Sequence, residues 1–368
     1  MTSIRGKSLS VYQPGLSAIM GLMSFRTLLS LFTVILLAII IFFSRHEILH
    51  ALELLESVNL WILVLILPLQ LLVYYAAGET IFSYLRSKKS IDELNPPTLA
   101  RMALEMNFVN HVLPSAEVSG ASYMNWRLGH YKVSAPRATM AQVVRFAMVF
   151  SSFITLLLVS VFVITIDGNI NRWILLVSSL LVTVMVSAIL LGIFLLSSHA
   201  RIVRFSRWLH VFVGKVVRRV TFGRKSNPVT EGVIEHFFND LHRDYVALLK
   251  DKGSLKKPFM WGLIFNAGDA GLFFLTFLAL GSVVNPAVIL IAYGLASMAG
   301  FFVITPGGTG AYEAIMVSFL AIAGIASGVA IAGILLTRVI ILLCTIGLGY
   351  VFYQDALIRY GKGKHPSL

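Results

Sequence analysis

Long stretches of the chain are apolar and carry no charge, as in Leu28–Ser44 and Phe146–Ile166. A run of about 20 apolar residues crosses the hydrocarbon core of a bilayer, about 30 Å thick, because a helix rises about 1.5 Å per residue. The pattern therefore predicts an all-α polytopic membrane protein with about eight transmembrane helices. The predicted spans are Thr27–Phe43, Leu60–Tyr84, Met140–Ile166, Trp173–Ser197, Phe259–Leu280, Ala287–Ile304, Ala311–Ile325 and Val329–Tyr353.

The sixth and seventh spans are short and flank a break that reads FFVITPGGTGAYE, residues Phe301–Glu313. Proline cannot continue a helix, and glycine adopts backbone angles that other residues avoid. Non-helical backbone at membrane depth is tolerated only where it is buried in protein or lines a wet cavity. The break thus predicts a polar site between two crossings or within one re-entrant hairpin. A plain tight turn is the alternative.

A second break lies between the second and third spans, within Thr98–Gly129. A moderately apolar helix, too short and polar to cross alone, ends there at the sequence PSAEVSG, Pro114–Gly120. We expect a re-entrant element that enters from the cytoplasmic side, with Pro114 and Pro306 as counterparts in an internal repeat. Paired broken segments in the two halves of a transporter point to its binding site.

Composition and charge agree with a membrane protein. Apolar residues make up 57% of the chain and charged residues 13%, and the net charge is +13. Basic loops alternate with loops poor in Lys and Arg, and the Ala200–Pro258 segment alone holds thirteen of them. The positive-inside rule then places both termini in the cytoplasm, at the cell inner membrane. Anionic lipid headgroups explain the basic excess, so we expect no nucleic-acid partner.

The predicted organisation has a cytoplasmic N-terminal segment (1–26), a transmembrane domain (27–353) with a basic amphipathic loop (199–258), and a cytoplasmic tail (354–368). Within the loop, Arg201–Val220 is predicted to be a basic amphipathic helix on the inner leaflet. Glu231–Leu249 is predicted to be an ordinary solvated helix. About 60 residues of loop are too few for a typical enzyme domain.

Charges inside a membrane are costly and usually functional. Five fall within or beside predicted spans: Glu79, Arg145, Asp269, Glu313 and Arg338. Two arginine side chains with planar forks suit a phosphate, although pairing with the carboxylates to hold helices together is an equal alternative. The predicted substrate-binding residues are Arg145, Arg338, Glu313, Pro306, Gly307, Gly308, Gly310, Tyr312, Pro114, Ser115, Glu117 and Asn107.

One motif suggests a metal. His46-Glu47-Ile48-Leu49-His50 matches the His-Glu-x-x-His pattern of zinc metalloproteases. It lies at the outer end of the first span in a short acidic loop, with no domain to form a cleft around it, so we predict no metal and no other cofactor. The only cysteine, Cys344, excludes a disulfide within the chain. The nucleotide-binding loops of pumps are absent from the sequence, so ATP-driven pumping is not expected.

The stretch TPGGTGAYEA, with Arg338 in LLTRVIILL, resembles the C-terminal signature of the lysylphosphatidylglycerol synthase transmembrane (flippase-like) family. The stretch LPSAEVSGASYMNWRLGHYKVSAPRATMAQVVRF resembles that family's first signature, and the similarity runs from about Phe25 to Tyr353. Departures are Glu117 in place of glycine, Thr337 in place of tyrosine, and no acidic residue before Arg145.

The resemblance implies a multi-pass inner-membrane protein. In bifunctional members a soluble domain transfers lysine onto phosphatidylglycerol, and the membrane part moves the product across the bilayer. The leading hypothesis is therefore a flippase-like lipid transporter that holds the phosphate of an anionic phospholipid or a polyprenyl-phosphate-linked lipid.

Two alternatives stay open. One is a membrane-embedded transferase or hydrolase, with Glu117 and His111 as its acid and base. The other is an anchor subunit for a separately encoded transferase. A second copy of the chain is a further possible partner.

Overall fold

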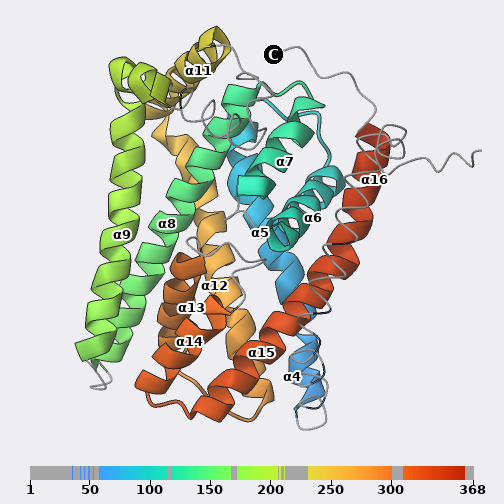
Figure 1. The fold of residues 1–368 in the computed structure, drawn as a ribbon, viewed down its shortest axis with the longest axis vertical. Coiled ribbons are helices and arrows are strands. Elements are labelled where there is room, and N and C mark those ends of the chain that lie inside the picture. The colour runs from blue at the N-terminus through green and yellow to red at the C-terminus, as the bar shows by residue number, and fades with distance from the viewer. Residues whose placement is uncertain are drawn as a thin grey trace, which may run out of the picture.

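The computed structural model describes residues 58–113, 118–166, 172–205, 231–300 and 310–360, together with isolated positions 35, 42, 45, 49, 53, 207, 208 and 211. Throughout this part the regular structure is helical, without strands (Figure 1). Five helices within it are long and apolar enough to cross a membrane. The predicted class, an all-α polytopic membrane protein, is confirmed.

The long helices agree with the predicted spans to within a few residues at most ends. They are α4 (Leu60–Val64) with α5 (Ile66–Ser87), α8 (Ala135–Ile166), α9 (Arg172–Leu196), η1 (Lys252–Leu255) with α12 (Lys256–Ala279), and a C-terminal helix built from α15 (Ser327–Cys344), η3 (Thr345–Gly349) and α16 (Tyr350–Tyr360). That last helix continues seven residues past the predicted end at Tyr353. The first predicted span, Thr27–Phe43, lies almost entirely outside the described residues.

Shorter helices are α6 (Pro96–Val112), α7 (Val118–Gly129), α11 (Glu231–Lys250), α13 (Pro286–Gly300) and α14 (Ala311–Ile322), and residues 199–205 are also helical. Local signals set several helix starts. The Asn59 side chain accepts a hydrogen bond from the Trp61 amide, and the Asn95 side chain accepts one from the Thr98 amide, each at 3.1 Å. Asparagine at these positions satisfies amides that have no partner inside the helix.

Helix α12 lies at the centre of the bundle and packs against α4, α5, α8, α13 and α15. Gly262 permits the close approach of α12 to α8, because a Cβ there would lie 2.7 Å from the Ser152 hydroxyl. One turn further on, the Asn266 amide donates to the Val149 carbonyl and to Ser152, both at 2.9 Å. The two long helices are thus joined by a polar contact within an apolar interior.

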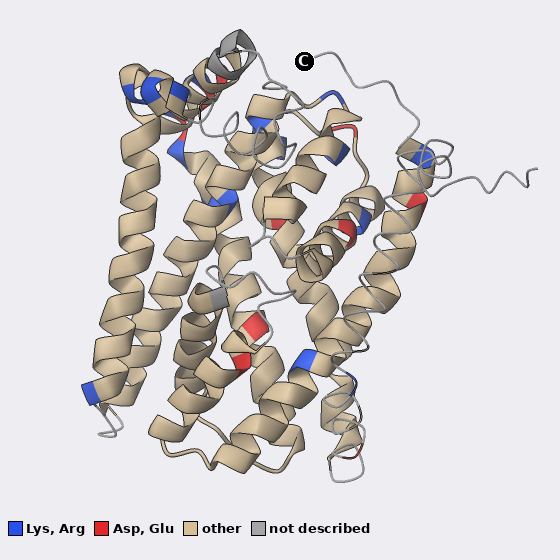
Figure 2. Ribbon diagram, in the orientation of Figure 1, with Lys and Arg blue, Asp and Glu red and all other residues tan. Residues whose placement is uncertain are grey.

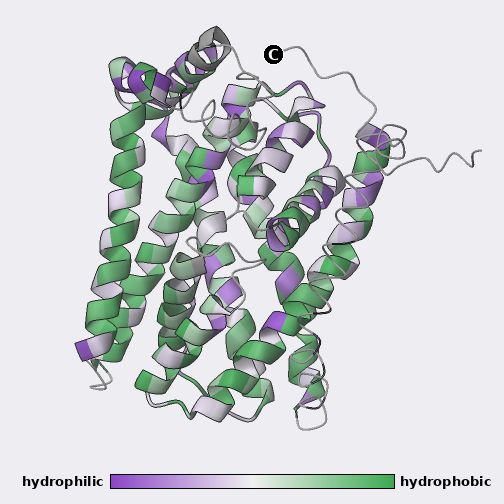
Figure 3. Ribbon diagram, in the orientation of Figure 1, coloured by the Kyte–Doolittle hydropathy of each residue, from purple (hydrophilic) through white to green (hydrophobic). Residues whose placement is uncertain are grey.

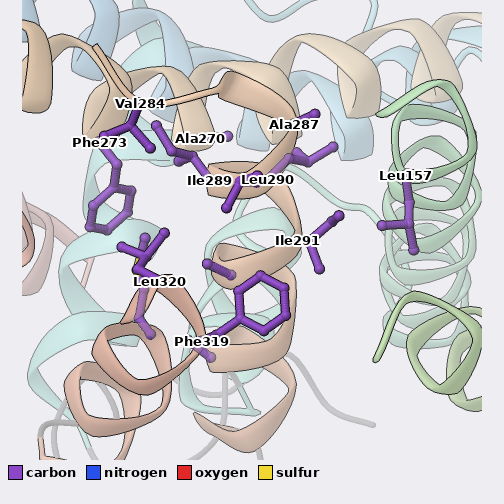
Figure 4. Close-up of a cluster of buried hydrophobic side chains, with 14 of the residues drawn as sticks. Leu157, Ala270, Phe273, Val284, Ala287, Ile289, Leu290, Ile291, Phe319 and Leu320 are labelled. Atoms are coloured by element: carbon purple, nitrogen blue, oxygen red, sulfur yellow. The ribbon is translucent and has the colours of Figure 1, made fainter. Parts of the chain in front are cut away.

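The two pairs of short helices occupy opposite halves of the bundle (Figure 1). α6 and α7 pack together in the half that carries α11, and α13 and α14 pack together in the other half. In that second half a buried apolar cluster joins α8, α12, α13 and α14 through side chains such as Leu157, Phe273, Ile289 and Leu320 (Figure 4). With 15 and 12 residues, α13 and α14 are about 22 and 18 Å long, shorter than the hydrocarbon core.

The loop helices differ in part from the prediction. α11 has the predicted extent, but it is not simply solvated, because Leu241, Tyr245 and Leu248 are buried and the helix packs on α8 and α9. Their spacing of three to four residues places them on one face, which covers the neighbouring helices. Of the predicted basic helix Arg201–Val220, the described residues are helical, and Trp208 is exposed.

Candidate functional site

An ion pair joins α14 to α15 within the apolar part of the bundle. The Arg338 Nε lies 2.9 Å from the Glu313 Oε1, with 21% and 14% of the two side chains exposed. The second oxygen of Glu313 accepts a hydrogen bond of 2.6 Å from the Gly310 amide at the start of α14. Gly310 has a φ of 91°, in the left-handed region that glycine adopts readily. Glu313 therefore caps its own helix and pairs with Arg338 at the same time.

Tyr312 packs beside this ion pair. The guanidinium carbon of Arg338 lies 4.5 Å from the centre of the Tyr312 ring, within the range of a cation–π contact. On α12, the Phe273 ring lies nearly parallel to Tyr312, with 6.3 Å between ring centres. Ser297 on α13 lies near the side chains of Tyr312 and Tyr293.

Asp269 extends the polar cluster into α12. The Tyr293 hydroxyl donates a hydrogen bond of 2.8 Å to the Asp269 Oδ2. The Asp269 carboxylate also lies near enough to act electrostatically on Tyr74 of α5 and on Tyr312. Three other helices, α5, α13 and α14, thus place tyrosine side chains around one carboxylate of α12.

Tyr74 links this cluster to the other short-helix pair. Its buried hydroxyl shares a hydrogen bond with the Thr345 hydroxyl of η3, and its ring meets the His111 ring of α6 edge-on with 6.4 Å between ring centres. Polar groups therefore form a row across the bundle from α6 to α15. We name it the central polar row: His111, Tyr74, Thr345, Asp269, Tyr293, Ser297, Tyr312, Glu313 and Arg338. Figure 3 shows hydrophilic positions on α12 and α15 amid hydrophobic ribbon.

The predicted site residues are only partly brought together. Gly310, Tyr312, Glu313 and Arg338 form one cluster. Arg145 is buried on α8, with its guanidinium 5.2 Å from the Phe146 ring centre. Arg145 lies 21 residues before the C-terminal end of α8, and Arg338 lies 11 residues after the N-terminal end of α15. Both of these helix ends lie away from α11. At about 1.5 Å per residue these distances are about 31 and 17 Å, so the two arginines lie at different heights.

Asn107 is buried on α6, and its amide donates 2.8 Å to the Ala103 carbonyl one turn earlier. Glu79 forms an ion pair with Arg86 on its own helix. The remaining predicted residues lie outside the described part of the chain, as do the histidines and glutamate of the zinc-like motif: Pro114, Ser115, Glu117, Pro306, Gly307, Gly308, His46, Glu47 and His50. Among the described residues, no group of three or more potential metal ligands occurs.

A second polar cluster was missed by the sequence analysis. Glu105 on α6 is fully buried and accepts hydrogen bonds from the Arg101 Nε (3.0 Å), the Arg127 Nε (2.7 Å) and the Tyr123 hydroxyl (2.8 Å). Burial opposes the charge of Arg127, but the Glu105 carboxylate outweighs burial and raises the pKa of Arg127. The four-residue spacing of Arg101 and Glu105 was the one available signal. Arg127 lies 22 residues from Glu105, a spacing that gives no signal in the sequence.

The same region contacts the C-terminal helix. Arg101 forms an ion pair with Asp355 of α16, and Asp355 is also paired with Arg359 at 2.9 Å. A ring nitrogen of His130, the residue after α7, lies 3.2 Å from the Tyr360 carbonyl. The Arg127 guanidinium packs over the Tyr360 ring at 4.2 Å. α6 and α7 are thus held to α16 by polar contacts.

The comparison with known families now applies to this arrangement. A sequence model of the family described as Lysylphosphatidylglycerol synthase TM region matches residues 25–349. The chain belongs to this family. The match includes both short-helix pairs and ends at the last residue of η3. The resemblance drawn from the two sequence signatures is therefore confirmed, and the chain is an integral membrane protein of this family.

A curated relative extends the comparison to an archaeon. The UPF0104 membrane protein of Methanothermobacter thermautotrophicus is 26% identical over 234 residues, which cover 63% of this chain and 67% of the relative. Its name identifies a membrane protein and specifies no activity.

Proposed function

We propose that this protein binds the headgroup of a phospholipid or another lipid-linked phosphate and moves it across the cytoplasmic membrane. The central polar row carries the proposal. It places three charged side chains, Asp269, Glu313 and Arg338, within helices whose outer faces are apolar. Ionisable residues inside a membrane are costly to keep and mark substrate or ion pathways.

The short helices support a path through the bilayer. α13 and α14 are each too short to cross, and both lie in the half of the bundle away from α11. We infer a re-entrant hairpin that enters from that side, opposite α6 and α7 on the α11 side. Transporters use such half-membrane helices to place helix ends beside a substrate near mid-membrane.

The Glu313–Arg338 pair suits exchange with a phosphate. Arg338 holds a permanent charge, and packing on Tyr312 orients its guanidinium plane. The N-terminus of α14 adds a partial positive charge at the same place. In this proposal the lipid phosphate replaces Glu313 at the guanidinium during transport, and Glu313 returns once the lipid leaves. The acyl or prenyl tails stay in the bilayer.

The charge distribution sets the proposed orientation. Lys and Arg gather at the end of the bundle that carries α11 (Figure 2). Cytoplasmic loops carry the excess of Lys and Arg, and anionic lipids attract them there. We propose that the α11 end faces the cytoplasm, with both termini on that side.

The test measures transfer of fluorescent phosphatidylglycerol between leaflets of proteoliposomes. Arg338→Gln is expected to lower the rate about tenfold or more, because losing a charge-assisted hydrogen bond costs about 1.5–3 kcal/mol. Arg243→Gln is the matched control, since Arg243 is exposed on α11 and pairs only weakly with Asp240. Wild-type transfer in Arg338→Gln would remove Arg338 from the mechanism. Absence of transfer together with a covalently changed lipid in mass analysis would favour an enzyme.

A further inference from the structure

The C-terminal helix, Ser327–Tyr360, is attached at two distant points. Near one end Arg338 pairs with Glu313 of α14. Near the other end Asp355 pairs with Arg101 of α6, and the Tyr360 carbonyl meets His130, which directly follows α7. Asp355 lies 17 positions after Arg338, about 26 Å along a helix that rises about 1.5 Å per residue. One helix therefore contacts both short-helix pairs.

A π-helical turn, η3, interrupts this helix between the two attachments. Such turns contain an extra residue, are rare, and occur often at functional sites. The Thr345 hydroxyl, at the start of η3, donates 2.7 Å to the Ile341 carbonyl and also meets the Tyr74 hydroxyl. Gly349 packs directly on α6, since a Cβ there would lie 2.5 Å from the Phe108 Cβ. The turn is thus held at a fixed point by α5 and α6.

Two polar contacts join α6 to α7. Buried Glu105 and Arg127 join the two helices at 2.7 Å. The Asn110 side chain also accepts a hydrogen bond of 2.9 Å from the Gly120 amide. The attachment to α16 combines the Arg101–Asp355 pair, with side chains 24% and 33% exposed, and a buried cluster in which Phe108 and Tyr123 meet Tyr353. The only charged side-chain pair described in this attachment, Arg101–Asp355, lies at its partly exposed edge.

We propose that the C-terminal helix is a lever hinged at η3, which couples the Glu313–Arg338 pair to the contact between α6–α7 and α16. Release of Arg338 from Glu313 frees α15, and the lever then loosens the contact of α16 with α7 about 26 Å away. Two sites are coupled in this way when an element between them has two arrangements and each site favours one of them. The inference rests on the proposed function for its role, since it makes binding at Arg338 regulate access from the α11 end.

Thiol reactivity tests the lever without any transport measurement. The background is Cys344→Ser, which removes the only cysteine, with His130→Cys as a reporter between α7 and α16. The purified protein is held in nanodiscs, so that a maleimide reaches both faces. Glu313→Gln is expected to raise the labelling rate about fivefold or more, the lower range of allosteric coupling. Asp240→Asn, which breaks an exposed pair on α11, is the control and is expected to leave the rate unchanged.

Gly347→Ala tests the hinge itself. A Cβ at Gly347 meets no atom within 4 Å, so the substitution stiffens η3 without a clash. It is expected to abolish most of the response to Glu313→Gln. Equal rates in Glu313→Gln and Asp240→Asn would overturn the coupling, and an undiminished response in Gly347→Ala would overturn the hinge. If Glu313→Gln does not give monodisperse protein, Arg338→Lys takes its place in the test, because lysine lacks the planar guanidinium that pairs with Glu313. Labelling that responds in a protein inactive toward lipid would defeat the proposed function alone.

Discussion

Glu313 and Arg338 meet at 2.9 Å between the first turn of α14 and the middle of α15. The carboxylate also caps α14 through the Gly310 amide, so one side chain satisfies a helix end and a cation together. Both groups are partly buried among apolar neighbours. The pair is therefore a structural contact in this state, and the same chemistry suits it to exchange its partner for a phosphate.

The Glu313–Arg338 pair is expected to stabilise the fold. Glu313→Gln should lower the free energy of unfolding by about 1–3 kcal/mol, because it weakens a helix cap and leaves a partly buried guanidinium poorly compensated. Thermal unfolding in detergent measures the effect. Arg338→Gln should cost a similar amount, and the double variant should cost less than the sum, since the residues share one contact. Additive losses would show that the two side chains act independently.

Glu105→Gln is expected to lower the free energy of unfolding more than the removal of an exposed charge does. Glu105 and Arg127 are 0% and 1% exposed, so the variant leaves a buried cation without its counter-charge. Breaking such a pair costs about 3–5 kcal/mol. Asp240→Asn on α11 is the control, with a change of about 0.5 kcal/mol or less. Equal unfolding temperatures for the two variants would contradict the burial argument.

Gly349→Ala is expected to disturb the packing of η3 on α6. The added methyl group would lie 2.5 Å from the Phe108 Cβ, and such overpacking typically costs about 1–3 kcal/mol. Gly347→Ala, two residues away in open space, should be neutral or slightly stabilising. Unfolding curves of the two variants side by side measure the difference. A larger loss for Gly347→Ala would disprove the contact.

The buried phenol of Tyr123 is expected to make the protein less stable at alkaline pH. Burial, and then the negative charge of Glu105, raise the pKa of Tyr123 above its ordinary value of 10.0. Below pH 10 the folded and unfolded states both keep the phenol proton. Above it the unfolded state releases the proton while the folded state holds it, so stability falls as pH rises.

Unfolding temperatures from pH 9 to 11 test this linkage. Tyr123→Phe should be less stable at pH 8, because it loses a hydrogen bond to Glu105, but it should decline less steeply above pH 10. Identical slopes in the two proteins would assign the alkaline loss to other groups.

Much of the fold could be predicted from the sequence, because the information is local. A run of apolar residues long enough to cross a bilayer identifies a span by itself, so the ends of α9 and α12 were predicted within a few residues. Arg338 and Glu313 were predicted as site residues because a charge inside an apolar run is conspicuous without any structure, and the structure shows that they pair. Family membership followed from two short signatures.

Only the tertiary structure decided which side chains meet. Glu105 finds Arg127 across 22 residues, and Tyr74 finds Thr345 across 271, and neither spacing has a helical period to signal it. The buried face of α11 and the separate heights of Arg145 and Arg338 depend on how helices pack and tilt. A sequence records neighbours within about one helical turn, whereas contacts between helices follow from the shapes of whole faces, which exist only once the chain has folded.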